Sequence, residues 1–325
     1  MDTQRTEQLK TWLNQQLPSA VGDLVPLSGD ASFRKYYRIN PNGKSLIAVD
    51  SDPQYEKNHA FVSIANMLAE QNICVPEIKA VDFFKGFMLL SDLGEQTFLP
   101  LLNKDTVDEL YGKAMDTLLD IQSCDVENIP EIPHFSEDML SEEFGYFTHW
   151  YLDKNKKIEL TDSDAKLLEK VSGILTENVQ EQPQVFVHRD YHSRNLLQVG
   201  RSVGVLDFQD AVIGPVTYDI VSLLRDLYIA WPAEQVYQWA FQYKNIMTIA
   251  GIIPEASDEK FKRWFDLMGV QRQIKNLGVF SRLAFRDNKP NYLNDIPTIM
   301  KYLDEVLVLY PEFKEFKTKL NIWSE

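Results

Sequence analysis

Two short apolar runs, each ending in a cluster of charged side chains, constrain this chain more than any other feature. Residues 185–187 (VFV) run directly into HRD at 188–190, and residues 203–206 (VGVL) run into DFQD at 207–210. Such runs, bounded by polar residues, are typical of short buried strands. A buried strand that stops at a carboxylate places it at the edge of a core, where it can hold a metal ion or a proton. We therefore expect residues 185–210 to carry the chemistry.

The bulk properties are those of an ordinary globular protein with a marked acidic balance. The 325 residues, 44% hydrophobic and 25% charged, suffice for two domains or lobes and a sizeable core. The net charge of −15 argues against a nucleic-acid partner, because phosphate binding needs a basic face. The same charge would favour a cationic substrate, although solubility alone explains it as well.

Cysteine usage and hydropathy indicate the compartment. Cys74 and Cys124 lack any CxxC spacing, which fits a reducing environment. The N-terminal residues 1–17 are amphipathic and carry acids, unlike a signal peptide, and no apolar run approaches the length of a membrane span. We expect a cytoplasmic protein with no membrane partner.

Apolar spacing predicts a small strand-rich part followed by a larger helical part. In the first part, the expected strands are 24–27, 33–39, 45–50, 78–84 and 86–90, and the expected helices are 4–17 and 53–70. After a polar connector at 91–94 (SDLG), helices are expected at 105–123, 136–152 and 162–180, and from residue 216 onward with breaks at Pro232, Pro254, Pro290 and Pro311. The expected boundaries are an N-terminal lobe at 1–92 and a C-terminal lobe at 93–325.

Three side chains of the central stretch form a set suited to phosphoryl transfer. Asp190 and Asn195 lie on one short loop, and Asp207 follows after a predicted hairpin. A carboxylate and an amide oxygen suit Mg²⁺, which completes its shell with phosphate and water. A second carboxylate can accept the proton of an attacking hydroxyl. Phosphoryl transfer needs this positioning and charge neutralisation more than covalent chemistry.

The same stretch resembles a known family. HRDxxxxN at 188–195 and DF at 207–208 are similar to the HRDxxxxN and DFG motifs of eukaryotic-type kinases. The wider wording, FVHRDYHSRNLL and VGVLDFQDAVIGPVTYDIVSLLRD, resembles the aminoglycoside phosphotransferase and choline kinase family. Within that family it is most similar to bacterial cell-wall amino-sugar kinases, which phosphorylate the anomeric hydroxyl of N-acetylmuramate or N-acetylglucosamine. The segment GDASFRKYYRI at 29–39 supports this narrower match.

The resemblance, which covers about residues 25 to 290, implies an α+β, protein-kinase-like fold of two lobes and an ATP- and Mg²⁺-dependent small-molecule kinase. It makes Asp190 the catalytic base, makes Asn195 and Asp207 the metal ligands, has His188 brace the loop, and has Asp219 accept hydrogen bonds from it. For the nucleotide, it implies a phosphate-covering loop with Gly29, Asp30, Ser32 and Arg34, and backbone contacts to adenine from Ser91, Asp92 and Leu93. Gln209 and Asp210 could contact the acceptor or cap a helix, and Arg225 could line the acceptor pocket or form a surface ion pair.

One part of the kinase pattern is missing. Kinases carry a lysine on the third strand, paired with a glutamate of the next helix. Here the third strand has Val49 or Asp50 at that place, and the following segment offers Glu56 but no acid clearly in register. We therefore expect the usual ion pair to be absent, with the cation supplied by Arg34 as first choice, or by Lys35 or Arg38.

Other functions remain open at this point. The short connection after Asp207 leaves no room for a long activation loop, which favours a small acceptor over a protein. An antibiotic or amine kinase would suit the net charge. A nucleotide-binding pseudokinase that acts as an interaction module would suit the missing lysine. The alternation of His188, Asp190 and His192 could belong to a metal-dependent hydrolase, but Asn195 and Asp207 favour a hard cation.

Overall fold

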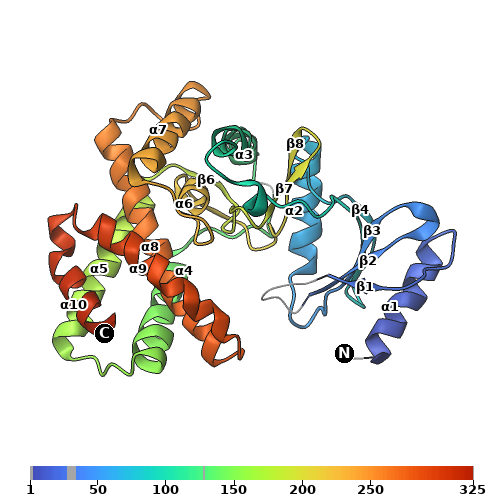
Figure 1. The fold of residues 1–325 in the computed structure, drawn as a ribbon, viewed down its shortest axis with the longest axis horizontal. Helices are drawn as coiled ribbons and strands as arrows, with labels where there is room; N and C mark the ends of the chain where they lie inside the picture. The colour runs from blue at the N-terminus through green and yellow to red at the C-terminus, as the bar shows by residue number, and fades with distance from the viewer. Residues whose placement is uncertain (1–2, 28–33, 127–128, 325) are drawn as a thin grey trace. The chain divides into compact units, whose positions relative to one another are not determined.

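The computed structural model describes residues 3–27, 34–126 and 129–324 (Figure 1). Across these residues, no helix combines the length and the apolar character that a membrane span requires. Contacts group the chain into two compact units, unit 1 (Met1–Ile132 and Arg194–Ala211) and unit 2 (Pro133–Ser193 and Val212–Glu325). The chain returns to unit 1 at Arg194, within the stretch that the sequence singles out.

Unit 1 is built on a five-stranded antiparallel sheet in the order β1-β2-β3-β5-β4. Its strands are β1 (Val25–Pro26), β2 (Lys35–Ile39), β3 (Leu46–Asp50), β4 (Ile78–Asp82) and β5 (Phe87–Ser91). The central strand β3 is buried along its whole length, as its unbroken apolar run predicts. Gly86 closes the β4–β5 hairpin at φ +71°, and an added Cβ would lie 1.9 Å from the Ser51 carbonyl oxygen, so only glycine fits there.

Helices and a second hairpin complete unit 1. They are α1 (Thr3–Gln16), α2 (Asn58–Glu70), α3 (Val107–Gln122), the 3₁₀ turns Pro41–Gly43 and Leu99–Leu101, and the hairpin strands β7 (Leu196–Val199) and β8 (Ser202–Val205). Helix α1 packs Leu9, Trp12 and Leu13 against the sheet. Helix α2 begins later than the spacing predicts, because the side chain and carbonyl of Asp52 hold the preceding residues in a turn.

Unit 2 is mainly helical. Its helices are α4 (Glu137–Tyr146), α5 (Asp162–Glu181), α6 (Tyr218–Leu224), α7 (Ala233–Ile249), α8 (Asp258–Phe285), α9 (Ile296–Leu307) and α10 (Lys314–Ser324), with 3₁₀ turns at Pro290–Asp295 and Pro311–Phe313. Each predicted proline break lies between two of these helices. A two-stranded sheet, β6 (Gln184–Val187) with β9 (Val212–Pro215), leads into the catalytic segment.

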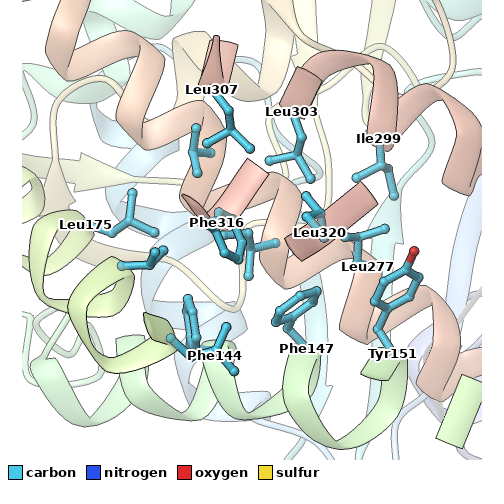
Figure 2. Packing of buried hydrophobic residues seen from close by; sticks show 14 of the residues in the cluster. Phe144, Phe147, Tyr151, Leu175, Leu277, Ile299, Leu303, Leu307, Phe316 and Leu320 are labelled. Carbon is cyan, nitrogen blue, oxygen red and sulfur yellow. The ribbon is translucent and has the colours of Figure 1, made fainter. Parts of the chain in front are cut away.

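The core of unit 2 surrounds α8, which is buried along most of its length (Figure 2). Phe144, Phe147 and Tyr151 pack with Leu277 of α8 and with Phe316 of α10 in one apolar cluster. Gly278 lets α8 pack closely against the backbone at Tyr146, because an added Cβ would lie 2.3 Å from the carbonyl carbon of Tyr146.

The predicted α+β class, with a β-sheet part followed by a helical part, is confirmed. The helix expected at 136–152 differs, because α4 gives way to a π-helical segment, Phe147–Asn155, against α8. The lobe boundary between residues 92 and 93 stays a prediction, since the compact units group residues 93–132 and 194–211 with the N-terminal sheet.

Candidate active site

In unit 2, the loop after β6 is clamped by one buried carboxylate. Asp219 of α6 accepts the backbone N–H of His188 at 2.6 Å and that of Arg189 at 2.9 Å. The buried His188 ring accepts the backbone N–H of Asp190 through Nδ1 at 3.2 Å. Arg189 has φ +75°, a conformation that costs a non-glycine residue about 1 kcal/mol or more. These contacts are of the kind that the resemblance implies for His188, which would brace the loop, and for Asp219, which would accept hydrogen bonds from it.

Cations surround the Asp190 carboxylate. Burial raises the pKa of Asp190, but the charges of Lys275, His192, Arg189 and Arg272 outweigh burial and hold the pKa below its ordinary value. The carboxylate is therefore ionised at neutral pH, as a proton acceptor must be.

Two of these cations, Arg189 and Lys275, are themselves held in place. Arg189 pairs with Glu143 of α4 at 2.6 Å, and Lys275 of α8 lies 3.5 Å from the same carboxylate. Lys275 also donates to the Tyr218 hydroxyl at 2.9 Å. The cations that act on Asp190 thus come from the loop and from α8, and Glu143 of α4 pairs with two of them.

Asp219 is a second titrating group of this loop. Burial raises the pKa of Asp219 to about 7, although the two backbone N–H groups that it accepts favour the charged form. Asp226 fixes the other end of the loop, because its carboxylate accepts both the N–H and the hydroxyl of Ser193.

Arg225 lies in the interior of unit 2. Its guanidinium pairs with the fully buried Asp266 at 2.5 Å and lies over the Phe265 ring at 4.6 Å. A surface ion pair, one of the two expectations for Arg225, is therefore wrong, because α8 packs over the side chain through Gly269.

In unit 1, the two expected metal ligands lie at the same end of the β7–β8 hairpin. Leu196 pairs with Val205, and the Leu206 N–H donates to the Asn195 carbonyl at 3.0 Å, so Asn195 and Asp207 flank the same end of the ladder. Asp207 has φ +66°, the second strained non-glycine backbone of the stretch.

The donor set fits a hard cation. Asp207 offers an exposed carboxylate, and Asn195 offers an amide oxygen. Gln209 does not cap a helix. Instead, its Nε2 donates to Asp207 Oδ1 at 2.7 Å and orients that carboxylate. Within the ranges described above, no group of three His, Cys, Asp or Glu side chains forms a separate metal cluster.

Arg34 reaches an acid after all. Its side chain is buried, and its Nε lies 3.3 Å from Glu56, just before α2, and donates to the Ser51 hydroxyl at 3.0 Å. The guanidinium lies over the Phe61 ring at 5.2 Å, and Phe61 stacks on Phe208 at 5.0 Å. Glu56, which the sequence did not place in register with the third strand, is therefore the acid that pairs with Arg34, just before β2. The turn at residues 53–57 brings Glu56 to the arginine.

The other cations expected near the phosphates have partners or are exposed. Arg38 pairs with Asp92 at 2.6 Å, and Lys35 is exposed at the start of β2. On β3, Val49 is fully buried and Asp50 pairs with Arg5 of α1 at 2.6 Å.

The connector after β5 has its side chains committed to unit 1. Asp92 accepts from Arg38 and from the Gly94 N–H, Ser91 Oγ accepts the Glu77 N–H, and Leu93 packs near Gly204. The backbone contacts to adenine that the resemblance implies stay a prediction. Asp210 pairs with Lys57 at 2.8 Å. Gly29, Asp30 and Ser32 lie outside the described residues.

Several site residues were missed from the sequence. Arg272 and Lys275 act on Asp190 from α8, and Glu143 of α4 pairs with Arg189 and Lys275; no local pattern signals any of the three. For Glu56 the sequence did contain a signal. The residues SDP at 51–53 are typical of a turn, so Glu56 could have been assigned to that turn and not to the following helix.

The comparisons with known proteins agree with this geometry. The model of the phosphotransferase enzyme family matches residues 23–252. An N-acetylmuramate/N-acetylglucosamine kinase of Pseudomonas putida is 40% identical over 321 residues, covering 96% of this chain and 94% of that protein.

Two solved structures share the fold at low sequence identity. A choline kinase from Streptococcus pneumoniae is 11% identical with a TM-score of 0.65, covering 93% of this chain and 100% of that one. An ADP-bound aminoglycoside phosphotransferase is 14% identical with a TM-score of 0.61, covering 93% of this chain and 98% of that one. The protein-kinase-like fold expected from the sequence is confirmed.

Proposed function

Because the chain belongs to the phosphotransferase enzyme family, we propose that it transfers the γ-phosphoryl group of ATP to the anomeric hydroxyl of an N-acetylated amino sugar, N-acetylmuramate or N-acetylglucosamine. One observation carries the proposal: a relative named N-acetylmuramate/N-acetylglucosamine kinase matches this chain almost from end to end. The protein is thus a small-molecule kinase that uses ATP.

Asp190 is the proposed proton acceptor. The acceptor oxygen forms a bond to the γ-phosphorus while the bond from that phosphorus to the β,γ-bridging oxygen breaks, and ADP leaves with the electron pair. The hydroxyl proton passes to the Asp190 carboxylate, which is ionised at neutral pH because nearby cations hold its pKa low. The clamp from Asp219 holds the loop that presents this carboxylate.

Asn195 and Asp207 are the proposed ligands of Mg²⁺, with Gln209 orienting Asp207. When bound, the cation would neutralise charge on the ATP phosphates. The strained backbone of Asp207 supports a functional role, because residues in such conformations cluster at active sites and ligand-binding sites.

Arg34 is the proposed replacement for the missing third-strand lysine. It follows directly on residues 29–33 of the expected phosphate-covering loop. Its pairing with Glu56, made from just before β2, is similar to the lysine–glutamate pair that kinases use to hold phosphates. A protein without this pair would resemble a pseudokinase, and its presence favours an active enzyme.

The charges at Asp190 also bear on the acceptor. An aminoglycoside is polycationic, and it would meet Arg189, Arg272 and Lys275 around the proposed base. Like charges at short range in a poorly hydrated site are repulsive. A neutral or anionic sugar fits this environment better than an antibiotic or an amine.

A substrate panel tests the proposal. The purified protein is offered ATP and Mg²⁺ with N-acetylmuramate, N-acetylglucosamine, kanamycin or choline, and ADP release is followed for the wild type and Asp190→Ala. We expect turnover with the sugars that the variant loses. Turnover with kanamycin or choline alone would show that the acceptor is an aminoglycoside or an amine and not a sugar. Nucleotide binding without turnover would show that the protein is a pseudokinase.

A further inference from the structure

The residue that precedes the proposed base has a strained backbone. Arg189 has φ +75°, in the left-handed region that non-glycine residues rarely occupy. Among the residues that the structure describes, the other non-glycine positions with positive φ are Asn42, Asn72, Lys157, Asp207 and Asn288. Asparagine and aspartate tolerate this region because their short side chains can hydrogen-bond locally, and Lys157 directly follows a helical segment, where such a conformation is common. Neither reason applies to an arginine in a loop.

Two carboxylates hold Arg189 in this conformation from different helices. Asp219 of α6 accepts its backbone N–H at 2.9 Å. Glu143 of α4 accepts a hydrogen bond from its guanidinium Nη2 at 2.6 Å, so the far end of the side chain is anchored as well. A residue that is fixed at both points has little freedom to rotate to an ordinary φ. The strain persists because the surrounding structure over-determines the conformation.

Glu143 is itself held in place. Its side chain is 4% exposed and belongs to the buried face of α4, next to Phe144. Its Oε1 accepts from Arg189 and lies 3.5 Å from Lys275 Nζ, and its Oε2 accepts from Gln271 at 3.4 Å. Both oxygens are thus engaged by protein side chains, which suits a residue that acts through its partners.

Stability alone does not explain why α4 carries an acid at this position. Taking a carboxylate and a guanidinium out of water has a cost that their attraction often only offsets, and apolar residues of similar size often stabilise a core equally well. An apolar pair, however, could not tie the side chain of residue 189 to a fixed point. Because each residue has only two soft backbone torsions, those of Arg189 set the direction in which Asp190 leaves the loop.

We propose that Glu143 is a positioning residue, which holds Arg189 at positive φ and thereby sets the orientation of the Asp190 carboxylate. The inference rests on the proposed function in one respect, since it takes Asp190 as the base, and it applies to any acceptor hydroxyl. Without the anchor, the loop relaxes toward an ordinary backbone conformation, and Asp190 is misdirected in most molecules. Glu143 itself takes no part in the bond exchange.

A comparison of glycine with alanine at position 189 tests the proposal. Arg189→Gly and Arg189→Ala both remove the guanidinium and its contact with Glu143. They differ in backbone preference, because glycine adopts positive φ about as readily as negative φ and alanine does not. We would measure kcat and both KM values with ATP and whichever acceptor of the panel the wild type uses. Urea unfolding verifies that each variant is folded.

Two further variants test the anchor itself. Glu143→Gln removes the charge that holds the guanidinium, and the double variant Glu143→Gln/Arg189→Gly removes the anchor from a loop that no longer needs it. Glu142→Gln is the matched control. Glu142 precedes Glu143 on the same helix, is exposed, and accepts a hydrogen bond from the Tyr146 hydroxyl at 2.6 Å.

We expect Glu143→Gln and Arg189→Ala each to lower kcat about tenfold, equivalent to about 1.4 kcal/mol, which is within the cost of a left-handed backbone for a non-glycine residue. Arg189→Gly should keep kcat within about threefold of the wild type, because its backbone is not strained. In that background, Glu143→Gln should change kcat less than about twofold. Both KM values should change less than about twofold throughout, and Glu142→Gln should match the wild type.

Equal kcat values for Arg189→Ala and Arg189→Gly would overturn the inference, because the backbone conformation at this position would then not limit the reaction. This comparison stands even if Glu143→Gln fails to fold. A wild-type kcat for a folded Glu143→Gln variant would also overturn it, as would an undiminished effect of Glu143→Gln in the Arg189→Gly background. Absence of turnover with every acceptor in the wild type would instead remove the proposed function, and this inference with it.

Discussion

The pair between Arg34 and Glu56 makes a quantitative prediction about the nucleotide side of the site. The side chains are only 1% and 13% exposed, and their closest atoms are 3.3 Å apart. Glu56→Gln keeps the shape and removes the charge. Arg34 is then left buried with a weaker partner, while its hydrogen bond to Ser51 and its contact with the Phe61 ring remain.

The size of the effect follows from these contacts. Removing one partner of a fully buried ion pair costs about 3–5 kcal/mol, because the other charge stays buried. The partial exposure of Glu56 and the two remaining contacts of Arg34 reduce this cost to about 2 kcal/mol. If the pair positions the guanidinium for the phosphates, the same variant should raise KM for ATP about tenfold.

A double-mutant cycle measures the pair directly. Urea unfolding and KM for ATP are determined for Glu56→Gln, Arg34→Gln and the double variant. We expect a coupling free energy of about 2 kcal/mol, since the two single changes break the same interaction. Glu77→Gln is the control, because its pair with Lys79 is exposed and should contribute less than about 1 kcal/mol. Additive effects, or an unchanged KM for ATP, would refute the reasoning.

Three further predictions concern the catalytic loop and the core. Asp190→Asn should lower kcat at least about a hundredfold and leave the dissociation constant of ATP unchanged, as measured by titration calorimetry. Because Asp219 takes up a proton as the pH falls through about 7, its hold on the loop should weaken and kcat should decline there, while Asp190 stays ionised. A rate that stays constant down to about pH 5 would contradict this role. Gly278→Ala should cost about 3 kcal/mol or more in urea unfolding, because its Cβ would lie 2.3 Å from Tyr146. Gly112→Ala, on α3 with no atom within 4 Å, should instead stabilise by about 1 kcal/mol.

Local patterns accounted for most of the fold. The apolar run of β3 and the hairpin signal at Gly86 determine secondary structure within a few residues, and Pro232, Pro254, Pro290 and Pro311 fall between helices because proline cannot continue the backbone hydrogen bonds of a helix. The π-helical segment, Phe147–Asn155, could not be foreseen, because it depends on packing against α8. Its sequence has the same apolar spacing as an ordinary helix.

The site residues fall into the same two groups: some follow from the local sequence, and others depend on tertiary packing. Asp190, Asn195 and Asp207 are signalled within twenty residues of sequence, because strands and turns of fixed length present them. Two of the cations that lower the pKa of Asp190 come from elsewhere. Lys275 and Arg272 are more than eighty residues beyond Asp190, and only the packing of α8 brings them near. Charge interactions between residues far apart in the sequence can therefore be identified only from the structure.

The net charge of −15 and the charges around Asp190 point to opposite kinds of acceptor, and their environments decide between them. Exposed carboxylates act through water and salt, with a screening length of about 8 Å at physiological ionic strength, so they influence encounter and solubility. Arg272 is buried, where screening is weak and each charge contributes more to binding. A cationic acceptor would lose its hydration next to these fixed cations, which is unfavourable. The acidic composition therefore bears on solubility and encounter, and we expect the cations around Asp190 to disfavour a cationic acceptor.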